Sequence, residues 1–486
     1  MDLPHLNPES PLPLVEQLTQ HYRESIEKGQ LRAGDRLPTI REIASHVGVT
    51  RTTVQGAYRR LQGLGLVQAT VGRGTVVRSA DLPGDAVFSA GARAAFDHIL
   101  RLPQPPAVQG PTVCDFAELK PDDSLFPVEA FSASIERVLS HRGPELLGYG
   151  QPTGDLDLRA ILAGRTPDVG GNPDDVLVTS GAQQGLDLVL RTFTRSGDGV
   201  AVALPTYHHL FGLLKSHGLR VVPLQDDGAG LDLEELARVL SNGDVRLLYL
   251  MPTFHNPTGR TMSLRQRQDL MDLVQRTQVP VLEDEFELDL RFAGDPLPSL
   301  RSLDARGLTV TVRTFSKGLF PGVRLGWLHA NRELIGPMAA LKHYMDLETS
   351  PLLQAAIADF LRSGGVELHL ATLCEQVRKR HEAVQAALTA HMPADFTWSV
   401  PDGGFAVWVQ GPKGFDSEHL ALLASRRGVR IAPGRWFTLG DGPVAGFRLS
   451  LSRAETAQIP QAIEILASCT AEMLAANRPS QRPLIL

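Results

Sequence analysis

A lysine beside a serine, with an arginine further along the chain, is the most specific chemical signal in the sequence. Thr314-Phe315-Ser316-Lys317 follows an apolar run and precedes Pro321-Gly322-Val323-Arg324. A lone lysine after a strand is usually a solvated strand end. In this setting the Lys317 amine suits a Schiff base with an aldehyde, while Ser316 and Arg324 suit an attached phosphate. The pattern therefore predicts a phosphorylated aldehyde cofactor on Lys317.

Four further segments follow the order that such a site requires. Ser180-Gly181-Ala182-Gln183 opens a predicted helix, so its backbone N–H groups could bind the phosphate. Tyr207 could stack on an aromatic ring, and Asn256 could hydrogen-bond a ring hydroxyl. A buried Asp284 would keep a pyridine nitrogen protonated and make the ring an electron sink. Singly, these features could be a turn, a cap or core residues, but together and in order they indicate a cofactor site.

Alternating strands and helices must position these residues. Apolar runs predict six buried strands, at Asp175–Thr179, Gly199–Ala203, Leu219–Pro223, Val245–Met251, Val279–Glu283 and Thr309–Thr314. Amphipathic stretches such as Ala182–Thr194 and Ser263–Thr277 separate them and predict helices. This alternation predicts an α/β domain with a mostly parallel sheet covered on both faces.

Length and composition predict a multidomain protein. The chain has 486 residues, 43% of them hydrophobic and 21% charged, which is typical of globular proteins with two or more domains. A segment rich in Pro, Gly and Ala at 79–112 predicts a linker between domains at 11–78 and 113–486. The net charge of −6 divides into +3 for residues 1–78 and −9 for the remainder, so only the first domain favours a polyanion.

The cellular location is predicted from what the chain lacks. No apolar run is long enough for a bilayer, and residues 1–10 do not resemble a secretion signal. The three cysteines, Cys114, Cys374 and Cys469, lie far apart and form no metal-binding pair. Their odd number suits a reducing compartment. We expect a cytoplasmic protein without a metal site.

The first domain has the pattern of a helix-turn-helix. Residues 13–28 predict an amphipathic helix, and Thr39 opens a second helix with Glu42 as its capping-box partner. Gly48 ends that helix, and Thr50 caps a third that runs to about residue 64. Any small three-helix domain has caps and glycine turns, so this pattern alone is open to a purely structural interpretation.

Polar residues mark the surface that would read DNA. The third helix starts Thr50-Arg51-Thr52-Thr53, and the first turn of a recognition helix faces base edges in the major groove. Two short predicted strands flank Gly72-Arg73-Gly74 and form a wing, where Arg73 would meet phosphates or the minor groove. Tyr58 is predicted to pack in the core.

The first domain resembles the winged helix of the GntR superfamily. The resemblance is carried by Leu37-Pro38-Thr39-Ile40-Arg41-Glu42-Ile43-Ala44, Gly48-Val49-Thr50-Arg51-Thr52-Thr53-Val54, Ala57-Tyr58 and Gly72-Arg73-Gly74-Thr75. It implies an all-α winged helix-turn-helix fold that binds double-stranded DNA. It also implies four contact residues: Arg41, Arg51, Thr53 and Arg73.

The second domain resembles the fold-type I pyridoxal 5′-phosphate enzymes of the aspartate aminotransferase group. The resemblance implies that the cofactor lysine, aspartate, asparagine and phosphate-binding arginine are Lys317, Asp284, Asn256 and Arg324. It also implies that Arg448, in Phe447-Arg448-Leu449-Ser450 near the C-terminus and before a strand, clamps an effector carboxylate. By the same resemblance, Tyr149 in Gly148-Tyr149-Gly150 reaches the phosphate of a partner subunit, which implies a homodimer.

The whole chain resembles the MocR/GabR subfamily of GntR regulators. These are dimers in which a linker joins a winged helix to an aminotransferase-like domain, and their effectors are pyridoxal phosphate or amines that react with it. The resemblance implies an imine on Lys317 that an effector amine displaces, with closure of the domain changing DNA binding. Two alternatives stay open: an aminotransferase with an ancillary DNA-binding domain, and a sensor of pyridoxal phosphate alone.

Three departures from the family pattern bear on this hypothesis. The family has Asp-Asp-Tyr where this chain has Asp284-Glu285-Phe286, so the phenol that bonds the cofactor is lost. His209 stands where members place an arginine two residues after the stacking tyrosine, which leaves the second anion contact and the effector class open. Residues 160–168 are expected to be too short for the helix normally found there.

Overall fold

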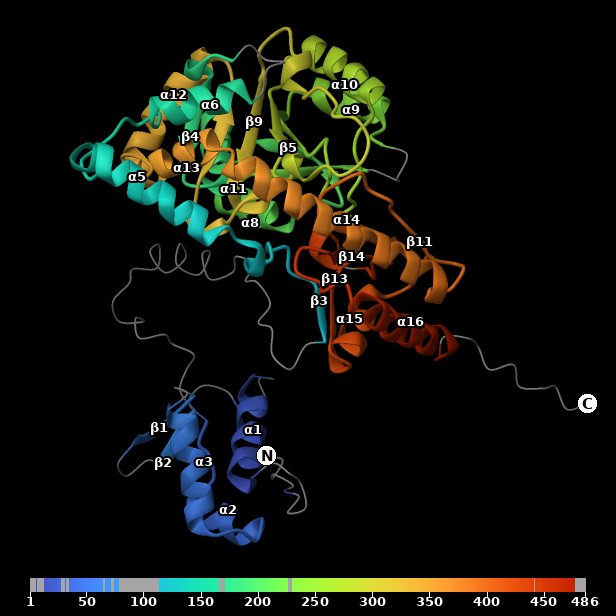
Figure 1. Cartoon of the computed structure of the whole chain (residues 1–486). Helices are drawn as coiled ribbons and strands as arrows, with labels where there is room; N and C mark the ends of the chain where they lie inside the picture. The colour runs from blue at the N-terminus through green and yellow to red at the C-terminus, as the bar shows by residue number, and fades with distance from the viewer. Residues whose placement is uncertain are drawn as a thin grey trace, which may run out of the picture. The chain divides into compact units, whose positions relative to one another are not determined.

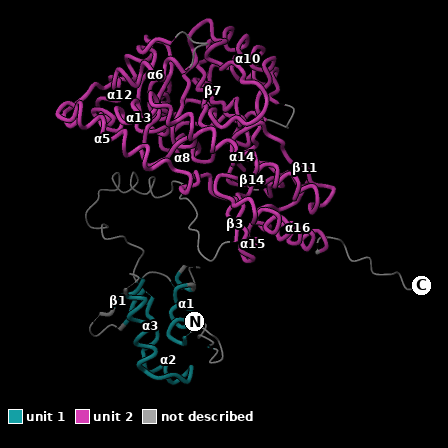
Figure 2. The backbone as a smooth tube through the Cα atoms, viewed as in Figure 1, with its two compact units in different colours: residues 1–101 teal, residues 102–486 magenta. Residues whose placement is uncertain are grey.

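The chain forms two compact units, residues 1–101 and 102–486 (Figures 1 and 2). The computed structural model describes residues 6, 13–27, 31, 35–63, 66–70, 74–77, 113–165, 171–225, 230–440 and 442–476. The predicted linker at 79–112 and the predicted wing residue Arg73 lie outside these ranges.

The described residues of unit 1 form three helices and a small antiparallel sheet. Its elements are α1 (Leu14–Glu27), α2 (Ile40–His46), α3 (Arg51–Gly63), β1 (Val67–Thr70) and β2 (Gly74–Val77). The predicted capping box is confirmed: the Glu42 N–H donates to Thr39 Oγ1 at 3.3 Å, and the Thr39 N–H donates to Glu42 Oε2 at 2.7 Å. Tyr58 is buried as predicted, and its hydroxyl donates to the Pro38 carbonyl.

A seven-stranded sheet forms the centre of unit 2. Its strands lie in the order β4 (Val176–Thr179), β10 (Gly326–His329), β9 (Thr309–Thr314), β8 (Val281–Asp284), β7 (Val245–Leu250), β5 (Gly199–Leu204) and β6 (Arg220–Gln225). The six predicted strands are all present, and β9, β8, β7, β5 and β6 run parallel to one another. The sequence did not predict β10, which pairs antiparallel with both β4 and β9.

Helices cover both faces of this sheet, because successive side chains of a buried strand point to opposite faces. Val200 and Val202 pack with α7 (Ala182–Phe193), α8 (His208–Ser216) and α12 (Arg332–Asp346). Ala201 and Ala203 pack on the other face with α9 (Leu233–Ser241) and α10 (Leu264–Thr277). Towards β4 and β10, a further apolar cluster includes residues of α6 (Leu156–Gly164), α11 (Phe315–Gly318) and α13 (Pro351–Arg362).

The expectation that no helix fits after Arg159 is wrong. The helix α6 starts earlier, at Leu156, because Asp155 caps it by accepting from the Leu158 N–H at 3.0 Å. Nine helical residues are therefore complete by Gly164. The first five residues of the stretch that suggested a missing helix, 160–164, form the second half of α6.

A second, five-stranded sheet forms the C-terminal part of unit 2. Its order is β11 (Thr397–Trp398), β12 (Ala406–Gln410), β14 (Gly446–Ser450), β13 (Val429–Pro433) and β3 (Cys114–Phe116). Its apolar cluster includes residues of α14 (Gly365–His391), α15 (Ser417–Arg426) and α16 (Ile459–Ala476). Figure 1 shows the long helix α14 extending from the seven-stranded region to this sheet, while α5 (Val128–Leu146) lies along the other end of the unit.

None of the helices in the described ranges combines the length and apolar character needed to cross a membrane. The same ranges contain no group of three or more His, Cys, Asp or Glu side chains placed to hold a metal ion. Cys114, Cys374 and Cys469 are free thiols.

Candidate functional site

The predicted cofactor residues gather at the carboxyl ends of neighbouring parallel strands. Asp284 ends β8, and Lys317 lies in the short helix α11 that directly follows β9. In open α/β sheets this edge is where ligands bind. A cavity of about 440 Å³ lies there. Nine of the predicted site residues line it: Ala182, Gln183, Tyr207, Asn256, Asp284, Ser316, Lys317, Arg324 and Arg448.

Lys317 presents an amine in a largely desolvated setting. Its Nζ donates to the Leu119 carbonyl at 2.6 Å. Burial lowers the pKa of the Lys317 amine, because a charged ammonium is poorly solvated there; Glu287 opposes the shift, and Arg448 and Arg324 add to it. The neutral amine, which is the nucleophilic form, is therefore more populated than on a free lysine.

Asp284 has one carboxylate oxygen that accepts a hydrogen bond and one that does not. It is 3% exposed, and its Oδ2 accepts from the Tyr249 hydroxyl at 2.8 Å. Its Oδ1 is buried and has no hydrogen-bond partner among the described side chains and backbone. Burial raises the pKa of Asp284 to about 7, against the lowering effect of the Tyr249 hydrogen bond. A buried carboxylate oxygen without a hydrogen bond is energetically unfavourable. A ligand in the cavity that donates a hydrogen bond to Asp284 Oδ1 would remove this penalty.

Arg324 lies close to the start of α7. Gly181, at the N-terminus of α7, has φ +89°, and a Cβ there would lie 2.7 Å from Arg324 Nη2. Arg324 Nη2 donates to the Ser180 carbonyl at 3.3 Å. Gly181 does not itself line the cavity, but its lack of a side chain lets the guanidinium approach the helix N-terminus. A cation and free helix N–H groups together suit an anion.

Arg448 lies inside strand β14, not before a strand as predicted. It is 2% exposed; its Nη1 donates to Asn256 Oδ1 at 2.9 Å and its Nη2 to the Ala117 carbonyl at 2.5 Å. Its guanidinium carbon lies 5.0 Å from the centre of the Phe437 ring. Its Nε is buried with no partner in the described part of the chain. These contacts hold the guanidinium at the wall of the cavity.

Tyr149 lies away from the cavity. Its side chain is 88% exposed, and the neighbouring Gly150 N–H donates to the Glu348 carboxylate. Leu147 and Tyr344 are also strongly exposed apolar side chains. Such exposed apolar residues suit a protein interface. The structure therefore does not bring Tyr149 to Lys317 within one chain.

Of the predicted DNA contacts, Arg41, Thr50, Arg51 and Thr52 are exposed, and Thr53 is half-buried. The Thr50 and Thr53 hydroxyls are 2.9 Å apart, and the Thr53 N–H donates to Thr50 Oγ1 at 3.2 Å, so Thr50 caps α3 as predicted. Arg73 lies outside the described residues.

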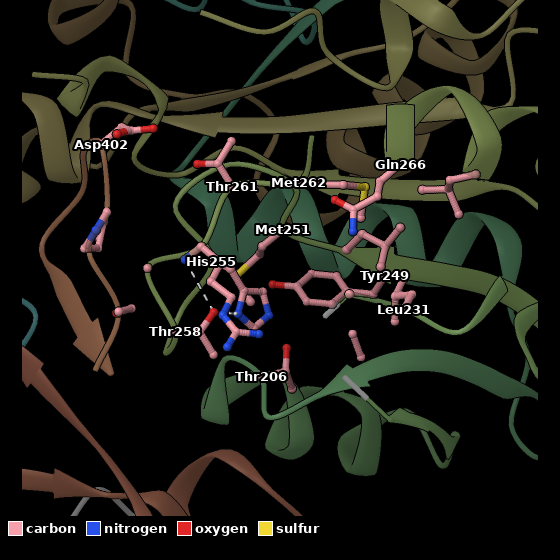
Figure 3. A pocket seen from close by; sticks show the side chains of 18 of the residues that line it. Thr206, Leu231, Tyr249, Met251, His255, Thr258, Thr261, Met262, Gln266 and Asp402 are labelled. Carbon is pink, nitrogen blue, oxygen red and sulfur yellow. Dashed lines mark hydrogen bonds between the residues drawn. The ribbon is translucent and has the colours of Figure 1, made fainter. Parts of the chain in front are cut away.

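A second cavity, of about 390 Å³, is seen from close by in Figure 3. Met251 lines both cavities. In Figure 3 the Tyr249 ring extends into this second space, with Met251, His255 and Thr206 near its hydroxyl end. The phenol that bonds Asp284 thus forms part of the boundary between the two cavities.

Sequence reasoning missed three kinds of residue at this site. Tyr249 reads as one apolar position of a buried strand, and only the pairing of β7 with β8 brings it to Asp284. Glu287 is fully buried, and the pKa of its carboxyl is raised by burial, while Lys317 and Arg448 favour its charge. His208 and Trp436 line the cavity from segments far apart in the chain. Of these residues only His208, which follows Tyr207, is next to a predicted site residue in the sequence.

Two family models match the chain. Residues 118–466 match "Aminotransferase class I and II", and residues 14–77 match "Bacterial regulatory proteins, gntR family". The transcriptional regulator TauR of Rhodobacter capsulatus is 30% identical over 93% of this chain and 96% of its own length. The probable rhizopine catabolism regulatory protein MocR of Rhizobium meliloti is 29% identical over 88% of each chain.

The fold also matches a solved structure. α-Aminoadipate aminotransferase LysN of Thermus thermophilus, crystallised with N-(5′-phosphopyridoxyl)-L-leucine, is 30% identical with a TM-score of 0.71. The match covers 81% of this chain and all of that one. Unit 2 therefore has the fold of an aminotransferase whose structure contains a phosphopyridoxyl group.

Proposed function

The chain belongs to the aminotransferase class I and II family, joined to a gntR-family domain as in the MocR/GabR regulators, and we propose that it is a transcription regulator that binds pyridoxal 5′-phosphate on Lys317. The observation that carries the proposal is the meeting of the Lys317 amine and the Asp284 carboxylate at one cavity of suitable size. Effector binding in this cavity changes how the gntR-family domain binds DNA.

The residues present fit the cofactor. The unpaired Asp284 Oδ1 offers an acceptor to a protonated pyridine nitrogen, and Tyr249 holds the other oxygen. Ser316, Arg324 and the N–H groups of Ala182 and Gln183 at the start of α7 suit the phosphate, with Gly181 leaving room. Tyr207 offers a ring for stacking, and Asn256 an amide for the ring hydroxyl.

When bound, the cofactor supplies a carbon that forms a double bond to one amine at a time, either Lys317 or an effector amine. Lys317 is prepared for this exchange because burial lowers the pKa of its ammonium. Arg448, held by Asn256 and the Ala117 carbonyl, presents a cation to the effector carboxylate. Phe286 lines the cavity without a phenol, so position 286 offers no hydrogen bond to the cofactor. The phenol of Tyr249 acts elsewhere, as a donor to Asp284.

The remaining assignments complete the proposal. Residues 11–78 bind double-stranded DNA through Arg41, Thr50, Arg51, Thr52, Thr53 and Arg73; 79–112 is the linker and 113–486 the effector domain. Two copies form a cytoplasmic homodimer, in which the exposed Tyr149 reaches the partner's phosphate. The exposed Leu147 and Tyr344 support an interface at this end of the unit.

An aminotransferase with an ancillary DNA-binding domain is the second candidate. It is favoured by the presence of Lys317, Asp284, Asn256 and Arg448 together at one cavity. Steady transfer of an amino group from donor to keto acid over many turnovers would support it. A regulator needs only exchange of the amine, and we expect at most slow turnover.

Visible absorbance of the purified full-length chain with pyridoxal phosphate, followed by borohydride reduction and peptide mass analysis, tests the proposal. We expect a visible band, fixed by reduction as a phosphopyridoxyl adduct on the Lys317 peptide. Lys317→Ala should lose both signals, whereas Lys215→Ala, which changes a lysine of α8 outside the cavity, should keep both. A wild-type protein without the adduct would contradict the proposal.

A further inference from the structure

One wall of the cavity has no part in the proposed cofactor contacts. It is made by His208 and His209, at the start of α8, and by Trp436, which follows β13. The two imidazole rings lie 4.0 Å apart at 37°, and the His208 ring lies 6.0 Å from the Trp436 ring at 43°. Phe437 packs edge-on against His208 at 5.7 Å. We call His208, His209 and Trp436 the ring wall.

The ring wall is uncharged at neutral pH. Burial lowers the pKa of His208 to about 3, and neighbouring His209 and Arg448 act in the same direction. Partial burial of its ring and the nearby Lys317 charge lower the pKa of His209 as well, although the residue as a whole is exposed. Both shifts favour the neutral imidazole, so the wall offers flat rings and neutral hydrogen-bonding nitrogens. The buried His208 Nδ1 has no partner in the described part of the chain.

The cations that line the cavity are few, and most have a place in the proposed cofactor contacts. Among the described residues they are Lys317, Arg324, Arg448 and Lys120. Lys317 and Arg324 belong to the cofactor contacts, and Lys120 is exposed, as is Glu118 of opposite charge nearby in the chain. Arg448 is therefore the one buried cation left for an effector. Arg448 packs against the Phe437 ring, and Phe437 in turn packs against His208 of the ring wall.

We propose that the effector is an amino monocarboxylate with an uncharged, aromatic side chain, held by Arg448 at its carboxylate and by the ring wall at its side chain. This inference rests on the proposed function and names its ligand class. Flat rings attract one another in offset and edge-on arrangements, which suits an aromatic side chain. A second carboxylate, as in aspartate or glutamate, would face neutral rings and lose its hydration without a partner.

The size of the preference follows from these two effects. An aromatic pair strengthens ligand binding by a few-fold, in addition to the effect of burying apolar surface. A buried carboxylate without a partner weakens ligand binding by about tenfold or more. We expect the apparent dissociation constant of L-phenylalanine to be roughly tenfold or more below that of L-aspartate or L-glutamate.

The experiment titrates the full-length protein, loaded with pyridoxal phosphate, with L-phenylalanine, L-aspartate and L-glutamate. Two readouts are followed: the visible spectrum of the bound cofactor and the thermal midpoint of unit 2. Wild type should respond to L-phenylalanine at the lowest concentration. His209→Arg places a cation on the ring wall at an exposed position, so it should shift the preference towards L-aspartate and L-glutamate.

A matched control is Arg220→Lys, which alters an exposed arginine of β6 outside the cavity and should leave the order of the three ligands unchanged. A loaded wild type that prefers L-aspartate or L-glutamate, or a His209→Arg protein with the wild-type order, would overturn the effector class. Failure of the wild type to bind the cofactor at all would instead contradict the proposed function.

Discussion

The cofactor cavity and the first turn of α3 are both polar, but they are built in opposite ways. In the cavity, Asp284 and Arg448 are 3% and 2% exposed and are held by hydrogen bonds from or to other segments. On α3, Arg51 and Thr52 are exposed. A buried polar group must be satisfied within the protein or by a ligand, whereas an exposed one is satisfied by water until DNA arrives. The cavity is therefore preorganised, and the helix surface is not.

This contrast predicts that a substitution in one of the two regions impairs the binding function of that region and leaves the binding function of the other unchanged. Changes in the cavity should alter cofactor binding without altering the DNA surface directly. Changes on α3 should alter DNA affinity and leave the cofactor spectrum unchanged.

Asp284→Asn should produce the largest loss. It removes the charge that pairs with a protonated pyridine nitrogen, and charge-assisted hydrogen bonds contribute about 1.5–3 kcal/mol. Equilibrium dialysis with pyridoxal phosphate should show roughly ten- to a hundredfold weaker binding. Asp187→Asn, at a residue of α7 outside the cavity, is the control and should bind as wild type. Unchanged affinity in Asp284→Asn would refute the role of this carboxylate.

Arg51→Ala tests the exposed region. We expect DNA affinity to fall by about 1–3 kcal/mol, because one arginine contact to a base or phosphate is lost. Fluorescence anisotropy with a duplex selected from a random library measures this. Arg220→Ala, in unit 2, should not alter it. If Arg51→Ala instead removed the cofactor band and left DNA binding intact, the division between the two regions would be wrong.

Tyr249→Phe should change the pH dependence of cofactor binding. The Tyr249 hydrogen bond lowers the pKa of Asp284, so its loss should raise that pKa further above its usual value. Cofactor binding that needs ionised Asp284 is lost as pH falls through this pKa, so the acid limit of binding should move to higher pH. At neutral pH the free energy of cofactor binding should be weaker than in wild type by about 0.5–1.5 kcal/mol.

The matched control for this prediction is Tyr22→Phe, which removes a buried phenol of unit 1. Its pH profile for cofactor binding should coincide with that of wild type. A Tyr249→Phe profile that also coincides with wild type would show that Asp284 does not depend on this phenol.

Thr39→Ala should have the smallest effect. It removes the N-cap of α2, which normally contributes about 1 kcal/mol to stability. Urea unfolding followed by a probe in unit 1 should show a lower midpoint, with the cofactor band unaffected. Equal destabilisation of both units would mean that they unfold as one.

The sequence predicted the elements that local rules determine. Thr39 with Glu42 predicted a helix start, and the apolar run from Thr309 to Thr314 predicted a buried strand, because caps and periodicity depend on neighbours in the chain. Motif order predicted residues such as Lys317 and Asp284, and the family resemblance implied the same residues, which line one cavity.

What could not be predicted depends on pairing between distant segments. The strand β10 is only Gly326–His329, too short to show a period, and its antiparallel position arises from partners on both sides. The hydrogen bond from Tyr249 to Asp284 forms only because β7 pairs with β8. The start of α6 at Leu156 is a different case, because its cap at Asp155 is a local signal that the sequence does carry.

The central claim is that the state of Lys317 changes DNA binding. The most direct measurement is the affinity of the full-length protein for a selected duplex, with and without pyridoxal phosphate and L-phenylalanine, in wild type and Lys317→Ala. The account predicts a change of at least about fivefold in wild type and none in Lys317→Ala. An equal response in both proteins, or none in either, would contradict it.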